Sequence, residues 1–282
     1  MRVQSHYTSR VHASSGRRGM DLPGRRRKIF PGTGPSGGMR RDVVVLVGAG
    51  LSTASGIPDY RSAEGLWTLF DPEEFHIERF LADPDGFWRR RVDLIQRSGI
   101  LDAEPNEGHR ILACAARDGP VAAIVTQNVD GLHHKAETPI GRIIEVHGDS
   151  ARSRCIACGR MEDTRAVVAR YGGGAPRCLR PRCGGLLRPN VVLFGEPVTR
   201  LGEAWDALRG ATTLVTVGTS LQVWPVAGLV QEALSAGIDV VIVNDAPTPF
   251  DGRATRVLRT DVVEGLGRLF PDAARGAAVH AS

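Results

Sequence analysis

The sequence predicts an α/β fold with a Rossmann-like parallel sheet, helices on both faces of that sheet, and a second, smaller and partly helical domain. Three observations support this prediction. Five short, β-branched apolar runs recur along the 282 residues at helix-length separations. A glycine-rich turn follows the first run. Two inserts interrupt the alternation, and one of them contains four spaced cysteines.

The apolar runs define the predicted strands, which cover residues 43–47, 122–126, 143–146, 213–217 and 239–243. Residues 204–209 and 227–236 are predicted to be covering helices. The large part of the folded domain (42–282) then comprises 42–64, 106–150 and 190–275, and the small part is formed by inserts 65–105 and 151–189. Because both inserts are expected to project from one edge of the sheet, the ligand site is predicted in the cleft between the two parts.

Charge is distributed unevenly along the chain. Residues 1–41 hold ten Lys/Arg and one acidic residue, whereas residues 42–282 hold 26 basic and 30 acidic residues. The basic tail is rich in Arg, Gly, Pro and Ser, a composition typical of disorder, organellar import or nucleic-acid contact. A solvated or mis-assigned start before Met39 is the simpler interpretation. Since the tail lacks the apolar stretch of a secretory signal, and no run approaches the ~20 residues of a membrane span, we expect a cytoplasmic protein without membrane contact.

A glycine turn, Gly48–Gly50, follows the first predicted strand. Strand, turn and helix together can present backbone N–H groups and a helix N-terminus to a phosphate, and Ser52 and Thr53 can add hydroxyl donors. A dinucleotide fingerprint would need a third glycine where Thr53 stands and an acidic residue at the end of a second strand about 20 residues later, and the sequence shows neither feature. The turn alone is therefore also compatible with an ordinary tight connection.

Four of the five cysteines form two closely spaced pairs. Cys155 and Cys158 have two residues between them, Cys178 and Cys183 have four, and 19 residues separate the pairs. Two tight loops at this separation can bring four thiolates into a tetrahedron, the geometry of a zinc ribbon. Disulfides are the alternative, which the lack of a signal peptide disfavours. Because four cysteines leave no open coordination position, we expect one structural Zn²⁺ without a catalytic role.

Polar side chains follow two of the predicted strands. His147 lies at the carboxyl edge of the sheet, where ligands bind in open α/β folds, and its imidazole titrates near working pH. Taken alone, His147 is more simply interpreted as a structural histidine, and a general base is the alternative. Asn128 and Asp130 follow the preceding strand and could equally form an Asx turn.

Several reactive side chains are expected to lie outside any site. Cys114 falls in the apolar run ILACAA and is predicted to be a packed core thiol. His109 is expected to be an orienting or core residue. His133 and His134, followed by Lys135, are predicted to form an exposed helix start.

The stretch Gly48–Ser62, GAGLSTASGIPDYRS, resembles the signature of the sirtuins of bacterial type, which are NAD-dependent protein lysine deacylases. Gly and Pro interrupt the helix expected after the turn and return a carboxylate and a guanidinium toward it. The resemblance continues in the family order through TQNVDGLH (126–133), EVHGD (145–149), the four cysteines, RPNVVLFGE (188–196), VGTSLQVWP (217–225) and VIVND (241–245). A single block could arise by chance, but the ordered set could not.

The resemblance implies roles for individual residues. His147 is implied as the catalytic base, with Asn128 and Asp130 at the nicotinamide ribose. The residues implied to bind NAD are Gly48, Ala49, Gly50, Ser52, Thr53, Ile57, Asp59, Tyr60, Arg61, Gln127, Asn128, Asp130, Gly218, Thr219, Ser220, Asn244, Asp245 and Asp261. The residues implied to bind the acyl-lysine peptide as an added strand are Val192, Phe194, Gly195, Glu196, Leu221 and Val223.

The resemblance also implies a reaction. The acyl-lysine amide oxygen attacks the anomeric carbon of the nicotinamide ribose, and nicotinamide leaves. His147 then activates a ribose hydroxyl that attacks the resulting imidate, which gives free lysine and O-acyl-ADP-ribose. The expected partners are acyl-lysine proteins or peptides, and the expected state is a monomer.

Three other functions fit parts of the sequence. A mono-ADP-ribosyltransferase on the same fold would share the NAD site. A zinc-ribbon nucleic-acid-binding protein would use the basic tail, but the acidic remainder of the chain argues against a nucleic-acid partner. A nicotinamide oxidoreductase is disfavoured by Thr53 in place of glycine.

Two positions depart from the family pattern. Sirtuins that remove succinyl or malonyl groups carry a Tyr-x-x-Arg pair in the helical insert, and counting from Trp88 places Arg91 and Leu94 there. The missing pair predicts a preference for acetyl or other apolar acyl groups. The run Arg89–Arg91 could turn a guanidinium inward, but three consecutive charges are more typical of a solvated helix face. Asp149 stands where Asn is usual, and the sequence alone gives no reason for it.

Overall fold

The apolar runs form a parallel sheet in the computed structural model, which describes residues 41–279. Its strands are β1 (Val43–Val47), β2 (Val121–Thr126), β3 (Ile143–Glu145), β7 (Thr213–Val217), β8 (Asp239–Val243) and β9 (Arg256–Leu258). All neighbours pair in parallel, in the order β3-β2-β1-β7-β8-β9. Strand β9 was not predicted, because this three-residue edge strand has an exposed arginine and no apolar run.

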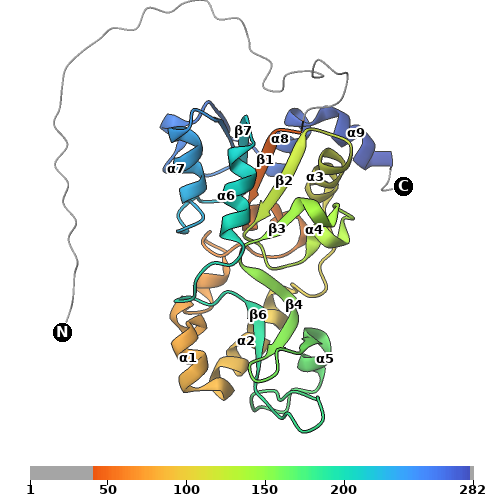
Figure 1. The fold of residues 1–282 in the computed structure, drawn as a ribbon, viewed down its shortest axis with the longest axis vertical. Helices are drawn as coiled ribbons and strands as arrows, with labels where there is room; N and C mark the ends of the chain where they lie inside the picture. The colour runs from red at the N-terminus through yellow and green to blue at the C-terminus, as the bar shows by residue number, and fades with distance from the viewer. Residues whose placement is uncertain (1–40, 280–282) are drawn as a thin grey trace, which may run out of the picture. The chain divides into compact units, whose positions relative to one another are not determined.

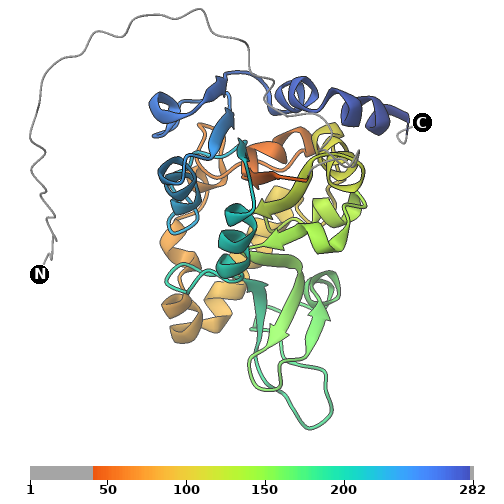
Figure 2. The ribbon, with the colours of Figure 1, turned by 45° about the horizontal axis from the view of Figure 1, so that its top comes forward.

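Helices cover both faces of this sheet (Figures 1 and 2). One face packs on α6 (Leu201–Arg209) and α7 (Gly228–Ser235) through alternate residues of the strands, such as Val44 and Leu46 in β1. The opposite face carries α3 (Glu107–Arg117) and α8 (Val262–Leu269), and α9 (Pro271–Val279) packs on these two helices. The remaining elements of this part are α4 (Leu132–Lys135) and the 3₁₀ turns η5 (Ile140–Arg142) and η6 (Asp251–Arg253). The predicted doubly wound arrangement is confirmed.

The strand order reverses on either side of β1. The chain first adds β2 and β3 on one side of it and later adds β7, β8 and β9 on the other. In open parallel sheets the crevice at such a switch point, outside the carboxyl ends of the strands, is where ligands bind. The fold therefore points to the loops that follow β1 and β7.

The two inserts build one second unit of structure around a separate apolar cluster. Its antiparallel sheet, in the order β5-β4-β6, consists of β4 (Gly148–Cys155), β5 (Met161–Asp163) and β6 (Leu187–Val191). Its helical elements are η3 (Leu66–Thr68), η4 (Pro72–Phe75), α1 (Ile77–Ala82), α2 (Pro84–Ser98) and α5 (Thr164–Ala169). Trp88 is fully buried in the shared cluster and donates its indole N–H to the Leu187 carbonyl at 2.8 Å. In Figure 1, β4 leads from the end of β3 into this small sheet.

The basic tail predicted over residues 1–41 lies, except for residue 41, outside the described residues. All described residues belong to one compact unit of the chain, Thr33–Ser282. Among residues 41–279, no helix combines the length and the apolar character needed to cross a membrane. Cys114 is buried at 7% exposure, which confirms the predicted core thiol.

Two buried histidines form a pair between α3 and α4. His109 and His133 are 0% and 3% exposed, and their rings lie 5.1 Å apart. None of their ring nitrogens has a hydrogen-bond partner among residues 41–279. The core position of His109 is confirmed, whereas the exposed position predicted for His133 is wrong. Burial lowers the pKa of His109 to about 2 and the pKa of His133 to about 4. Both rings are therefore neutral in the folded protein at neutral pH.

This pair is expected to make the fold sensitive to acid. The unfolded chain binds protons near pH 6.5 while the folded chain resists them, so the free energy of unfolding should fall as the pH drops from 6.5 toward 4, by up to about 1.4 kcal/mol per pH unit per histidine. Urea unfolding between pH 7 and 4.5 measures this slope. His133→Leu should flatten the slope and the exposed His134→Gln should not; equal slopes in all three proteins would contradict the assignment.

Candidate active site

A cavity of about 860 Å³ opens at the switch point of the large parallel sheet and extends toward the small unit built by the two inserts. This volume lies within the usual range for small-molecule sites. The predicted site residues that line it are Gly48, Ala49, Gly50, Thr53, Asp59, Tyr60, Arg61, Gln127, Asn128, His147, Val192, Phe194, Gly195, Glu196, Gly218, Thr219, Ser220, Val223, Asn244, Asp245 and Asp261. Four predicted residues lie behind the wall instead: Ser52, Ile57, Asp130 and Leu221.

The turn after β1 packs directly on the turn after β7. The N–H of Gly48 donates to the Val217 carbonyl at 3.0 Å, and the N–H of Gly50 donates to the Gly218 carbonyl at 2.8 Å. A Cβ at Gly48 would lie 2.6 Å from the Cβ of Thr219, so this crossing of two backbones requires glycine. The neighbouring loop therefore already uses the N–H groups of Gly48 and Gly50, so a phosphate at this turn would depend on other donors.

The chain continues into short 3₁₀ turns rather than an α-helix. These are η1 (Ala49–Leu51) and η2 (Thr53–Ser55), and Gly56 ends the second with a φ of +81°. The following Asp59 accepts the N–H groups of Arg61 and Ser62 at 3.1 and 3.0 Å, which returns this segment to the cavity wall as predicted from the Gly and Pro residues. Ile57 instead packs in an apolar cluster with Ile95, Ile100 and Leu132.

The imidazole of His147 is held in one tautomer. Its Nδ1 lies 3.0 Å from the Gln127 carbonyl, and because a carbonyl only accepts, Nδ1 carries the proton. Nε2 is therefore left with a free lone pair on a residue that lines the cavity. Burial lowers the pKa of His147, and the bond to Gln127 partly opposes this shift. A neutral, oriented imidazole is the state that a general base requires.

A hydrogen-bonded chain runs from the cavity wall into the protein. Asn128 donates its Nδ2 to the Gly48 carbonyl at 3.1 Å and to the Ser52 hydroxyl at 3.0 Å, and Ser52 donates to Asp130 at 2.7 Å. Because the Gly48 carbonyl fixes which end of the amide is nitrogen, the Oδ1 of Asn128 is the atom left for a ligand. Asp130 also accepts the N–H of Leu132, and burial raises the pKa of its carboxyl group. Asp130 and Ser52 thus position Asn128 from behind.

Hydrogen bonds hold two other predicted site residues, Asp261 and Thr219, in place. Asp261 caps α8 by accepting the N–H groups of Val263 and Glu264, and the hydroxyl of Thr219 accepts a hydrogen bond from Gln127 at 3.2 Å. Leu221, predicted to contact substrate, is 3% exposed and packs in the core against α6 and α7. Its adjacent residue Val223 does line the cavity.

An ion pair holds the end of residues 192–196, the segment predicted to bind peptide. Arg188 in β6 donates both terminal nitrogens to the Glu196 carboxylate at 2.6 Å, and this guanidinium holds the pKa of Glu196 below its usual range. Glu196 also accepts the N–H of Leu193 at 2.9 Å. The N–H of Phe194 donates to the Phe75 carbonyl at 3.3 Å. The segment is therefore bonded to Phe75 of the first insert and to Arg188 of the second. Glu196 therefore shapes the segment with an already paired carboxylate.

The structure gives Asp149 a local role. Its carboxylate accepts the N–H of Ala151 at 2.7 Å and pairs with Arg152 at 2.7 Å. These contacts lie where the pairing of β4 with β6 is irregular, between Gly148 and Ser153. Asp149 thus stabilises the backbone directly after His147.

Residues from the helical insert also line the cavity, and they were not among the predicted site residues. Trp67 lies between Tyr60, Phe75 and Phe194, with ring centroids 5.0 to 6.0 Å apart. Arg91 also lines the cavity. It is 5% exposed and donates one nitrogen to the Ser150 hydroxyl at 2.7 Å, while its Nε has no partner.

The solvated face expected for the whole arginine run is therefore wrong for Arg91. Arg89 and Arg90 are exposed, but Arg91 is three residues after the buried Trp88 and precedes the buried Leu94 by the same interval. Helical spacing of three places these side chains on one face. This spacing to buried residues was the sequence signal that Arg91 lies inside the protein. Trp224, which is exposed and lines the cavity, has no such spacing signal.

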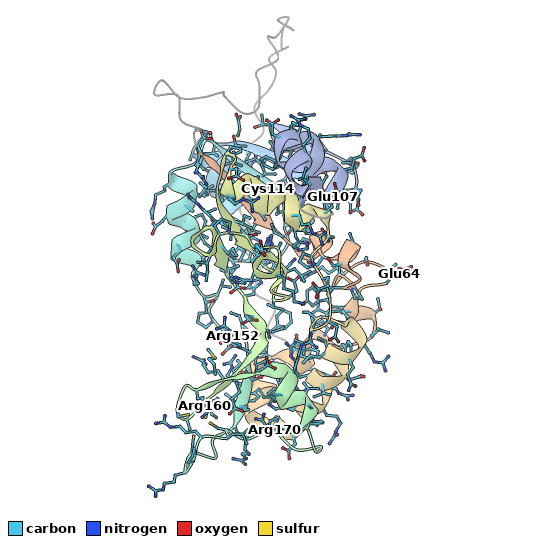
Figure 3. All side chains as sticks on the ribbon, turned by 90° about the vertical axis from the view of Figure 1, so that its right-hand side faces the viewer. Glu64, Glu107, Cys114, Arg152, Arg160 and Arg170 are labelled. Atoms are coloured by element: carbon cyan, nitrogen blue, oxygen red, sulfur yellow. The ribbon has the colours of Figure 1, made fainter. Side chains whose placement is uncertain are left out.

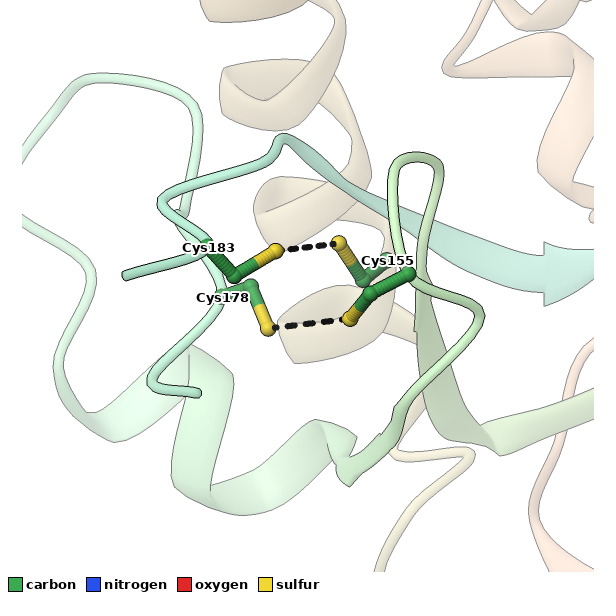
Figure 4. A group of neighbouring side chains, drawn as sticks. Cys155, Cys178 and Cys183 are labelled. Carbon is green, nitrogen blue, oxygen red and sulfur yellow. Dashed lines mark hydrogen bonds between the residues drawn. The ribbon is translucent and has the colours of Figure 1, made fainter. Parts of the chain in front are cut away.

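The four paired cysteines converge on one point (Figure 4). Their sulfur atoms all lie within 4.8 Å of one another, and the Cys155–Cys183 and Cys158–Cys178 pairs are 3.7 and 3.8 Å apart. A tetrahedral Zn²⁺ with Zn–S bonds of about 2.3 Å places its sulfur ligands about 3.8 Å apart. The thiols are free rather than joined in disulfides. The predicted four-cysteine set is thus positioned to bind a zinc ion.

Fold and site together define an α/β protein with a cavity at the switch point of its parallel sheet and a separate four-cysteine cluster positioned to bind a metal ion. A model of the Sir2 family matches residues 48–225, and the chain belongs to that family. The NAD-dependent protein deacetylase of Haloarcula marismortui is 42% identical over 229 residues, which cover 79% of this chain and 86% of the relative. NAD-dependent protein deacetylase 2 of Streptomyces coelicolor is 43% identical over 243 residues, covering 83% and 97%.

A solved Sir2 structure is similar over most of both chains. It contains a deacetylated p53 peptide and 3′-O-acetyl ADP ribose, and it matches with a TM-score of 0.75 and 34% identity. The match covers 83% of this chain and 94% of that chain.

Proposed function

We propose that this chain is an NAD-dependent protein lysine deacylase. Acyl-lysine, NAD and one water would give free lysine, nicotinamide and O-acyl-ADP-ribose. The observation that carries the proposal is His147: its tautomer is fixed by the Gln127 carbonyl, and it lines a cavity shared by the switch-point loops and the segment ending at Glu196. The named activities of the relatives and the ligands of the similar Sir2 structure support the same reaction.

The residues present suit the co-substrate NAD. The Oδ1 of Asn128 can accept a hydrogen bond from a ribose hydroxyl, since its Nδ2 is already used by Gly48 and Ser52. His147 accepts a proton at Nε2 from the ribose hydroxyl that captures the acyl group. Asp130 acts through Ser52 and keeps Asn128 in place. Bound NAD supplies the electrophilic ribose carbon, and these residues orient it and move the proton.

We propose that different parts of the chain bind NAD and the acylated peptide. Residues 42–64, 106–150 and 190–275 hold the co-substrate, and inserts 65–105 and 151–189 complete the acyl and peptide sites. Because the cavity is built from one chain, we propose a monomer as the working unit. Four neighbouring free thiols suit a reducing compartment, which supports a cytoplasmic location.

A direct test is deacylation of an acetyl-lysine peptide with and without NAD. The proposal predicts free lysine only when NAD is present, together with nicotinamide. Release of nicotinamide with the acetyl group still on the lysine would instead favour the mono-ADP-ribosyltransferase.

The acyl preference rests on two features of the cavity. Its apolar wall, with Trp67, Phe75, Phe87 and Leu94, supports acetyl and other apolar acyl groups as the main substrates. Arg91 favours acidic acyl groups as a second class, because its buried guanidinium has no carboxylate partner among residues 41–279 and its Nε makes no hydrogen bond there. A carboxylate that reached Arg91 would gain a charge-assisted hydrogen bond.

Arg91→Ala separates these two classes. We expect kcat/KM for a succinyl-lysine peptide to fall at least ~10-fold, the loss of one buried charge-assisted contact, while kcat/KM for the acetyl peptide changes much less. Arg90→Ala is the matched control, since Arg90 is the exposed neighbour and pairs with Glu74. If wild type leaves succinyl-lysine untouched, or if both substrates lose activity equally, the acidic class is eliminated.

A further inference from the structure

Positive charge is concentrated in the insert that carries the cysteines. Residues 151–189 contain nine arginines, no lysine and two acidic residues, a net charge of +7. The rest of residues 42–282 holds 17 basic and 28 acidic residues, a net charge of −11. Since Zn²⁺ with four thiolates contributes about −2, the loaded insert keeps a net charge of about +5. The slightly acidic total of residues 42–282 therefore hides a strongly polarised molecule.

Several of these arginines have no counter-charge. The side chains of Arg160, Arg180 and Arg182 are exposed and make no hydrogen bond or ion pair with any residue between 41 and 279. By contrast, Arg165 pairs with Asp102, and Arg170 pairs with Glu162. Figure 3 shows Arg160 and Arg170 on the small insert-built unit, away from Cys114 and Glu107 on α3.

Apolar side chains are exposed among the unpaired arginines. Leu179 is 64% exposed, Ile156 is 51% exposed and Met161 is 42% exposed. Leu179 and Ile156 each directly follow a cysteine of the metal site, and Met161 directly follows Arg160.

The backbone segments that carry these residues meet at the cysteine cluster. The N–H of Cys155 donates to the Arg160 carbonyl at 2.9 Å, and the N–H of Cys183 donates to the Arg180 carbonyl at 3.0 Å. Because all four sulfur atoms lie within 4.8 Å of one another, the two loops hold their adjacent residues close together. We call this set the knuckle surface: Ile156, Arg160, Met161, Leu179, Arg180 and Arg182.

We propose that the knuckle surface is a docking site for an acidic, amphipathic segment of a protein substrate, remote from the acyl-lysine itself. Guanidinium groups bind carboxylates through paired hydrogen bonds, and the exposed aliphatic side chains cover the apolar residues of the same segment. Arginine and methionine are enriched at protein interfaces and lysine is depleted there, which is the composition found here. No aromatic side chain belongs to the surface, so it lacks the stacking platform that single-stranded nucleic acids use.

The binding test uses the full-length, zinc-loaded protein and a fluorescein-labelled peptide of 20 residues built from Glu and Leu at helical spacing. Fluorescence anisotropy should show binding that weakens at least ~10-fold in Arg160→Ala/Arg180→Ala/Arg182→Ala, because about three charge-assisted contacts are lost. The matched control is Arg209→Ala/Arg268→Ala/Arg275→Ala, which removes three exposed arginines that pair with Asp206, Glu264 and Asp272. Since every variant keeps residues 1–41, the basic tail contributes equally to all measurements.

Each outcome decides the proposal. Equal peptide affinity in wild type and in the knuckle variant overturns it. Tighter binding of a 20-base-pair DNA duplex than of the peptide, lost in the same variant, also overturns it and makes the occupant a nucleic acid. A Gln/Leu peptide that binds as well as the Glu/Leu peptide would show that the arginines do not recognise charge.

The kinetic arm rests on the proposed deacylase function. Joining the Glu/Leu segment to an acetyl-lysine peptide through a Gly/Ser linker should lower KM in wild type and leave kcat unchanged. The knuckle variant should lose this KM advantage and still process the short acetyl peptide like wild type. Absence of turnover with the short peptide in wild type would contradict the proposed function, while the anisotropy result would still decide the docking site.

Discussion

Replacing His147 with alanine is expected to abolish most deacylation while preserving the fold and NAD binding. Removal of a general base typically lowers the rate by about 10² to 10⁴-fold, and no other imidazole lines the cavity among the described residues. The ring donates one hydrogen bond, to the Gln127 carbonyl, so its loss should disturb the structure little. The measurement is kcat for an acetyl-lysine peptide at saturating NAD, together with the affinity for NAD by calorimetry.

The pH profile provides a second readout of the same residue. Because burial lowers the pKa of His147, its imidazole stays neutral at a pH where an ordinary histidine is already protonated. The acid limb of kcat/KM should therefore lie below pH 6.5, the ordinary value. Activity of His147→Ala within a few-fold of wild type would refute the assignment of the base.

Loss of a metal-site cysteine is expected to have the second large effect. Cys155→Ser and Cys178→Ser each remove one of four sulfur ligands, and both cysteines are also buried in the apolar cluster shared by the two inserts. Binding of a structural zinc is coupled to folding, so the variants should lose zinc and unfold at least ~5 °C lower than wild type.

The control for this effect is Cys114→Ser. Cys114 is buried beside α9 in the large part of the protein and lies outside the cysteine cluster. Elemental analysis should find one zinc per chain in wild type and in this control. A freshly purified wild-type protein with well under one zinc per chain would contradict the zinc assignment.

Much of the fold was predictable because buried parallel strands leave a local signal. The runs at 43–47, 213–217 and 239–243 coincide with β1, β7 and β8 residue for residue. Each is continuous and β-branched because both faces of the sheet are covered. Strand β9 has only three residues and an exposed arginine, so its pairing with β8 depends on tertiary context.

Parts of the site could not be predicted because they depend on long-range contacts. The Ser52 hydroxyl was expected to face a ligand, but its partner Asp130 is 78 residues away in the sequence and draws it inward. The N–H groups of Gly48 and Gly50 are likewise used by a loop about 170 residues later. The buried position of Arg91 could be predicted from its three-residue spacing to Trp88, but the run of three arginines favoured a solvated helix face instead.

The most direct test of the proposed function is the product balance of a single reaction. With an acetyl-lysine peptide and NAD, mass spectrometry should find nicotinamide, free lysine peptide and O-acetyl-ADP-ribose in equal amounts, with the acetyl carbon on the ribose. His147→Ala should form the free lysine peptide and O-acetyl-ADP-ribose far more slowly, because it removes the base that acts after nicotinamide has left. ADP-ribose attached to protein or peptide with the acetyl-lysine intact, or NADH formation, would contradict the deacylase account.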